Sequence, residues 1–184
     1  MRYFNPQTGK QVSFDASMTG GQRIIAHNAK GAPSVLWITR APEAALKRIF
    51  IAPNKRSFMT EDGKPFFWLG DTGWLLFSKL DRDQAVEYLD DRKQKGFNVV
   101  QVMVLHTLHV NNAYGEPALI NNNVALPALV NRDDYWDHVD FIVDAAAERG
   151  IYVAMVPIWG GNVKAGHVSV DEAKKYAAFL ANRY

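Results

Sequence analysis

Three consecutive segments of this chain repeat one order: an apolar run, a polar or glycine-containing stretch, and an amphipathic helix. The predicted strands are residues 66–69, 97–105 and 151–158, and Gly96 and Gly150 end the helices that precede the second and third strands. Alternating strands and helices are typical of a parallel sheet with right-handed crossovers. The sequence therefore predicts an α/β fold in which the residues following the strands share one edge of the sheet.

The three predicted helices begin with N-terminal capping signals. A side-chain oxygen at the N-cap accepts a backbone N–H of the first turn, and a Glu or Gln three residues later completes a capping box. The signals are Asp81 with Gln84, Asp133 or Asp134, and Ser169 with Glu172. We expect Trp136 and His138 to pack the second helix onto the sheet. The inner face of the third helix is predicted to carry Ala173, Tyr176, Ala177 and Leu180.

The first strand is predicted from a turn and an apolar run. The dipeptide Asp62-Gly63 tolerates the positive φ of a tight turn, so residues 57–60 are expected to pair with the following strand as a hairpin. The run of residues 66–69 is wholly apolar, which predicts a strand buried on both faces with Trp68 in the core. The polar stretch of residues 70–74 then follows at the expected strand end.

The first 40 residues differ from this pattern. Short apolar runs separated by turn residues predict a few antiparallel strands, at 2–4, 11–14 and 34–39. Such strands are too few to bury a core of their own. We therefore divide the chain into a small β segment at 1–40, a linker at 41–54 that contains a helical turn at 43–47, and an α/β domain at 55–184.

Composition excludes several classes of protein. The 184 residues contain no cysteine, which excludes disulfides, thiolate metal sites and cysteine nucleophiles. A net charge of +2 without a basic stripe argues against nucleic-acid binding, and no apolar run approaches the ~20 residues of a membrane span. The N-terminus lacks the apolar core of a signal peptide, which read literally predicts a cytoplasmic protein. A fragment that had lost its leader would look the same and would be periplasmic or extracellular.

Four stretches resemble the apiosidase-like glycoside hydrolases, a bacterial family long described as a domain of unknown function. They are Thr60 to Trp74, Lys95 to Val102, Tyr135 to Asp140 and Met155 to Gly160, in order within residues 55–184. The family fold is a (β/α)8 barrel acting on plant cell-wall glycans. The resemblance therefore implies the first three βα units of a TIM barrel and a pectic glycan as substrate.

The N-terminal segment also has a counterpart in this family. Family members usually carry a small β domain, nominally collagen-binding, after the barrel. Arg2 to Lys10 resembles the opening motif of that domain but stands before the barrel. This order suggests a permuted, tandem or mispredicted gene.

Glycoside hydrolysis uses two carboxylates about 5–9.5 Å apart. Asp71 is the one acid predicted at a strand end, since Glu116 lies in a long loop and the other acids lie mainly on helices or caps. In the resembling family the catalytic pair lies on the fourth and later strands, which the resemblance places beyond Tyr184. We therefore assign no catalytic residue, cofactor or metal and expect this chain alone to be inactive. Its expected partners are a carbohydrate and the missing remainder of the barrel.

Six residues are predicted to form a substrate-binding site at the strand ends. Indole rings offer flat apolar faces to the C–H groups of a sugar, while carboxylate, imidazole and amide groups can bond its hydroxyls. The residues are Asp71, Trp74, His106, Trp159, Asn162 and His167. Structural alternatives are open: Asp71 can accept hydrogen bonds from loop amides, and the two tryptophans can pack the barrel.

Two other functions are open. A metal-dependent TIM-barrel hydrolase would need ligands at the strand ends, for which the candidates are Asp71, His106, His109 and His167. Loss of a full-length relative's activity on chelation would favour this function. The chain could also be a non-catalytic glycan-binding module or a relic. Affinity for pectic oligosaccharides without hydrolysis would favour the module, and the lack of both properties would favour the relic.

Overall fold

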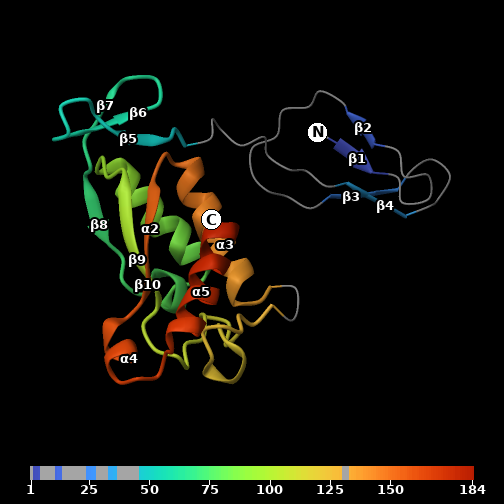
Figure 1. The fold of residues 1–184 in the computed structure, drawn as a ribbon. Coiled ribbons are helices and arrows are strands. Elements are labelled where there is room, and N and C mark those ends of the chain that lie inside the picture. Colours follow the sequence, from blue (N-terminus) through green and yellow to red (C-terminus); the bar gives the residue numbers. More distant parts are fainter. Residues whose placement is uncertain (1, 5–10, 14–23, 28–32, 37–45, 130–132) are drawn as a thin grey trace. The chain divides into compact units, whose positions relative to one another are not determined.

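The computed structural model describes residues 2–4, 11–13, 24–27, 33–36, 46–129 and 133–184 (Figure 1). It divides into two compact units, Met1–Ala44 and Ala45–Tyr184, each of which is treated by itself. The boundaries predicted from the sequence, at 40 and 54, stay a prediction.

The described residues of the first unit form four short strands. They are β1 (Arg2–Phe4), β2 (Gln11–Ser13), β3 (Ile24–His27) and β4 (Pro33–Leu36). β1 pairs antiparallel with β2, and β3 pairs antiparallel with β4. The two strands predicted near the N-terminus agree with β1 and β2, and the turn predicted between them lies outside the described residues. Trp37 and most of the helical turn predicted at 43–47 lie outside the described residues.

The second unit is a mixed α/β fold. Its strands are β5 (Ile49–Ile51), β6 (Phe58–Thr60), β7 (Pro65–Phe66), β8 (Gly70–Thr72), β9 (Val99–Leu105) and β10 (Tyr152–Ile158). Its helices are α1 (Leu76–Lys79), α2 (Arg82–Gln94), the 3-10 helix η1 (Ile120–Asn122), α3 (Tyr135–Glu148), α4 (Gly160–Lys164) and α5 (Val170–Arg183).

Two sheets organise this unit. β8, β9 and β10 form a parallel sheet with β9 in the centre, which confirms the predicted βαβ order. β5, β6 and β7 form a small antiparallel sheet that includes the predicted hairpin. In Figure 1 the antiparallel sheet lies near the end where the parallel strands begin, and α4 lies at the end where they finish. Tyr152, the first residue of β10, donates its hydroxyl to the carbonyl of Lys47 at 2.5 Å and contacts the ring of Phe66.

The core lies between the parallel sheet and its helices. Val100, Val102 and Val104 of β9 are fully buried in one apolar cluster with residues of α2 and α3. Trp136 of α3 is also fully buried, and its indole N–H donates to the carbonyl of Ala118 at 2.9 Å. Its ring packs against the aromatic residues Tyr135, Tyr176 and Phe179.

The predicted helix boundaries are confirmed. Asp81 with Gln84 and Ser169 with Glu172 form capping boxes, and Asp134 caps α3 through the amides of Trp136 and Asp137. Gly96 and Gly150 end α2 and α3 with φ of 83° and 73°, a left-handed conformation that costs glycine little. Trp136 is buried in the cluster that contains β9, as predicted. His138 is buried too, but its ring contacts Tyr114 and the carbonyl of Leu80, which lie outside the parallel strands, so its predicted packing onto the sheet stays a prediction.

The predicted first strand at 66–69 is wrong. β7 ends at Phe66 and β8 begins at Gly70, so the residues between them form a link. Phe67 is 78 % exposed and Trp68 is 47 % exposed, so Trp68 does not lie in the core. The Asn98 side chain explains the link, since its amide donates to the carbonyl of Phe67 and its oxygen accepts the N–H of Leu69. These bonds fix the crossing from the antiparallel to the parallel sheet.

Trp136→Ala tests this core. Truncation of a fully buried indole should lower the free energy of unfolding by about 3–5 kcal/mol, because apolar contacts and a hydrogen bond are lost. Urea unfolding followed by far-UV circular dichroism measures the change. Lys174→Ala, on the exposed face of α5, is the control and should shift stability by less than about 0.5 kcal/mol. Equal stabilities of the two variants would contradict the assignment of Trp136 to the core.

Candidate functional site

Two tryptophans meet at the end of the parallel sheet. Trp74 follows β8, and its carbonyl accepts the N–H of Met103 in β9 at 3.0 Å. Trp159 follows β10 and donates its N–H to the carbonyl of Leu105 at 2.9 Å. The two indole rings pack edge to face, with centroids 6.0 Å apart and an interplanar angle of 88°. Since Trp74 is 41 % exposed and Trp159 52 % exposed, this aromatic pair offers apolar ring surface to a ligand.

His106 and Asn162 lie at the same edge of the sheet. Asn162 in α4 donates its side-chain amide to the carbonyls of His106 and Trp159, at 3.3 and 3.2 Å. The Nδ1 atom of His106 is buried and has no hydrogen-bond partner among the described residues. Burial and the nearby Lys79 ammonium lower the pKa of His106, so its imidazole is neutral at neutral pH. A neutral ring presents one donor and one acceptor, which suits sugar hydroxyls.

His167 and His109 lie on the surface. His167 follows α4, where its backbone N–H donates to the carbonyl of Asn162 at 3.2 Å, and its side chain is exposed. His109 is exposed in the loop after β9. Within the described part of the chain, no three histidine, aspartate or glutamate residues lie close enough to hold a metal ion. The geometry of the described residues therefore does not support the hypothesis of a metal-dependent hydrolase.

The sequence predicted Asp71 at the end of a strand, but the structure does not place it there. It lies inside β8, and its carboxylate is bound to α2: the Tyr88 hydroxyl donates to it at 2.7 Å and the Arg92 guanidinium at 2.6 Å. The backbone N–H of Thr72 donates to the other carboxylate oxygen at 2.8 Å. These contacts are structural ones that join β8 to α2. A sugar-binding role for Asp71 stays a prediction.

The surroundings of Asp71 favour its ionised form. Burial opposes ionisation, but the hydrogen bonds from Tyr88 and Arg92 outweigh burial and lower the pKa of Asp71 below its ordinary value. The same carboxylate and burial raise the pKa of Tyr88. The ionised carboxylate of Asp71 therefore lies between the neutral phenol of Tyr88 and the cationic guanidinium of Arg92.

Two polar residues of the parallel sheet escaped the sequence analysis. Thr72, Gln101 and Ala154 are neighbours across the three parallel strands, with Thr72 exposed and Gln101 half-buried. Asp71 and Thr72 are consecutive residues of β8, so their side chains lie on opposite faces of the sheet. Thr72 therefore faces away from α2, whose side chains bind Asp71.

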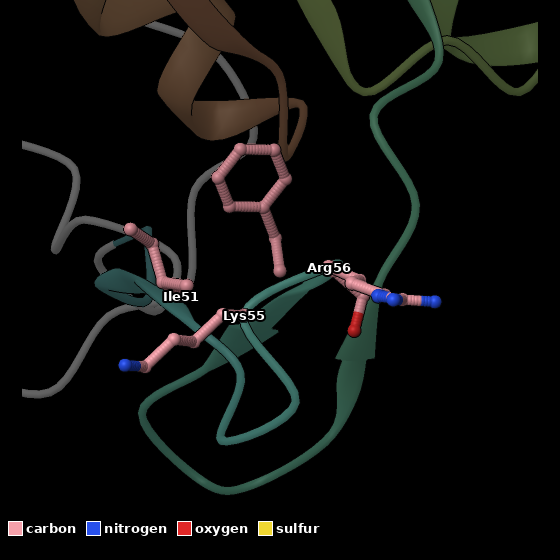
Figure 2. A pocket seen from close by; sticks show the side chains of 5 residues that line it. Ile51, Lys55 and Arg56 are labelled. Atoms are coloured by element: carbon pink, nitrogen blue, oxygen red, sulfur yellow. The ribbon is translucent and has the colours of Figure 1, made fainter.

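A hollow lies in the antiparallel sheet, among residues other than those of the aromatic pair. It has a volume of about 230 Å³, is formed by the β5–β6 hairpin, and is lined by Ile51, Lys55, Arg56, Ser57 and Phe58. Figure 2 shows that Lys55 and Arg56 point away from each other, so the two cations do not converge on one ligand. No helix among the described residues has the length and apolar character needed to cross a membrane.

Residues 52–184 match the model of a protein family described as "Apiosidase-like, catalytic domain". The chain belongs to the apiosidase-like glycoside hydrolases. The resemblance carried by its four sequence stretches is thereby confirmed. No curated protein matches the chain.

Solved structures agree with this membership. A structure titled "Glycoside hydrolase" is 40% identical, with a TM-score of 0.71 over 80% of this chain and 33% of its own. A glycoside hydrolase family 5 structure from Bacteroides vulgatus ATCC 8482 also has 40% identity and a TM-score of 0.71, over 80% of this chain and 32% of its own. This apiosidase-like chain thus spans about a third of the length of these relatives.

Asp71→Asn tests the link between β8 and α2. At neutral pH the variant should lose about 1–3 kcal/mol of unfolding free energy, because Arg92 and Tyr88 lose a charged acceptor. The folded pKa of Asp71 is lowered, so its stabilisation is complete above the ordinary value of 3.8 and disappears as pH falls through the folded pKa. The two proteins should therefore converge in stability in strong acid.

Urea unfolding from neutral pH to about pH 2.5 measures this convergence. Glu87→Gln, an exposed change on α2, is the control and should leave stability nearly unchanged at neutral pH. A difference between wild type and Asp71→Asn that stays constant over this range would show that the charge of Asp71 does not stabilise the fold.

Proposed function

We propose that this chain supplies part of the sugar-binding site of a glycoside hydrolase that acts on pectic glycans of the plant cell wall. Family membership supports the class of reaction. The observation that carries the proposal is the exposed aromatic pair at the edge where parallel α/β enzymes bind substrate. Trp74 follows β8 and Trp159 follows β10, and β9 lies between those two strands.

The proposed site surrounds this pair with polar groups. The indole faces would stack on the C–H face of a sugar ring, and His106 and Asn162 would bond hydroxyls beside it. Thr72 and Gln101 would extend the polar surface along the sheet. Of the six residues predicted from sequence, Trp74, Trp159 and Asn162 are joined by contacts, and Asn162 also bonds the backbone of His106. Asp71 and His167 stay as untested candidates.

The catalytic carboxylates are proposed to lie outside these 184 residues. Asp71 is the one acid within β8, β9 and β10, and its carboxylate is engaged by Arg92 and Tyr88. Hydrolysis needs two carboxyl groups, of which one acts as the acid and the other as the nucleophile or base. The three parallel strands would then be the first three of a (β/α)8 barrel, which agrees with relatives of which the matched part is about a third.

Trp159→Ala tests the sugar-binding role. Titration of the ¹⁵N-labelled chain with oligogalacturonides should shift the indole N–H signals of Trp74 and Trp159. The variant should bind about tenfold more weakly, equivalent to about 1.4 kcal/mol, because one stacking face is lost. Trp68→Ala is the matched control, since Trp68 is similarly exposed but lies at the opposite end of β8. Equal weakening by both variants would refute a site at the aromatic pair.

The chain alone should release no reducing sugar from these oligosaccharides, because the part of it that the structure describes presents no free pair of carboxylates at the sheet edge. A reducing-end assay on wild type, with Asp71→Asn as the comparison, measures this directly. Hydrolysis by wild type that disappears in Asp71→Asn would contradict the proposal and would identify Asp71 as a catalytic residue.

A further inference from the structure

Each tryptophan of the aromatic pair is followed by a short helix that ends in a lysine. α1 begins two residues after Trp74 and ends at Lys79, and α4 begins directly after Trp159 and ends at Lys164. Each lysine therefore lies five residues after its tryptophan. Because β8 and β10 run parallel to β9, both helices follow the sheet at the edge where the aromatic pair lies.

Both lysines are exposed cations. Neither ammonium group forms an ion pair or a hydrogen bond with a residue that the structure describes, whereas Lys47 and Lys95 are bound by aspartates. Lys79 also acts on a residue of the proposed site, since burial and then the charge of Lys79 lower the pKa of His106. An ammonium group offers three N–H donors and a full charge, so these two lysines are available to an anion.

The segments that follow the three parallel strands contain no acidic residue. They are residues 73–80, 106–115 and 159–170. Their lysines and arginines are Lys79 and Lys164 alone. Inside β8, the charge of Asp71 is balanced by Arg92. The charge that these segments bring to the edge is therefore positive, and an edge of this kind attracts an anionic ligand.

We propose that Lys79 and Lys164 make the sugar-binding site selective for glycans that carry ionised carboxylates, as chains of uronic acid units do. The indole faces of Trp74 and Trp159 would hold sugar rings whatever their charge, since they contact C–H groups. The ammonium groups would add charge-assisted hydrogen bonds to the carboxylates of those rings or of the next ones. A neutral glycan would form only the first kind of contact. This inference rests on the proposed function, because it concerns the same site.

Two glycans that differ mainly in charge test the proposal: an oligogalacturonide and the same oligosaccharide with methyl-esterified carboxylates. Each is titrated into the ¹⁵N-labelled chain at neutral pH and low salt, with the indole N–H signals of Trp74 and Trp159 as the readout. Wild type should bind the acidic form about tenfold more tightly, because two exposed ion pairs form. About 1 M salt should abolish this preference by screening.

Lys79→Gln and Lys164→Gln should each weaken binding of the acidic form about threefold, and the double variant about tenfold, while the affinity for the ester stays unchanged. Lys93→Gln is the matched control. Lys93 is also an exposed lysine in the last turn of a helix, but α2 ends where β9 begins, at the opposite end of the sheet. This variant loses the same charge and should keep both affinities.

Equal affinity of wild type for the two glycans overturns the proposal, and this comparison requires no variant. A preference that the double variant retains overturns it too, as does a loss in Lys93→Gln equal to that in Lys79→Gln. Urea unfolding shows that each variant is folded. The outcomes separate the two proposals: equal binding of acid and ester leaves a sugar site at the aromatic pair, whereas binding of neither glycan overturns both.

Discussion

The pairing of β9 with β8 and β10 is the constraint on which the rest of this structure depends. β9 is buried along most of its length, and its two parallel neighbours start in register with it, at Gly70 and Tyr152 opposite Val99. Because all three strands run the same way, the segments that follow β8 and β10 leave the sheet at one edge. Trp74 and Trp159, 85 residues apart in the sequence, therefore come into edge-to-face contact.

A polar contact fixes the first strand in this arrangement. Asp71 binds Tyr88 and Arg92 of α2, and the guanidinium of Arg92 also lies over the ring of Tyr88. A half-buried carboxylate is costly without partners, and here it has a cation, a phenol and a backbone amide. This contact ties β8, which has three residues, to a helix of thirteen. It also holds the carboxylate on the side of the sheet that α2 covers.

The sequence was informative where local chemistry decides the structure. Capping boxes at Asp81 and Ser169 and the glycines after α2 and α3 depend on neighbouring residues, so their positions were predicted correctly. The start of β8 depends on Asn98, which is 29 residues away from Leu69, and no local pattern reveals it. The apolar run at 66–69 therefore predicted a strand where the structure has an exposed link. That shift moved Asp71 from the expected strand end into the strand.

The same contrast applies to the site and to α5. Aromatic residues after apolar strands could be predicted to gather, because strand direction alone brings them together. Whether a residue on a helix face is covered depends on what packs there, which is why Ala177 is exposed although its spacing is that of a buried stripe.

The most direct test of this account is a nuclear Overhauser experiment on the chain bound to an oligogalacturonide. The account predicts intermolecular signals between sugar C–H protons and the ring protons of both Trp74 and Trp159, since one sugar would lie across the aromatic pair. Signals from the sugar to Trp68 or to the β5–β6 hairpin instead, with none to the pair, would contradict it.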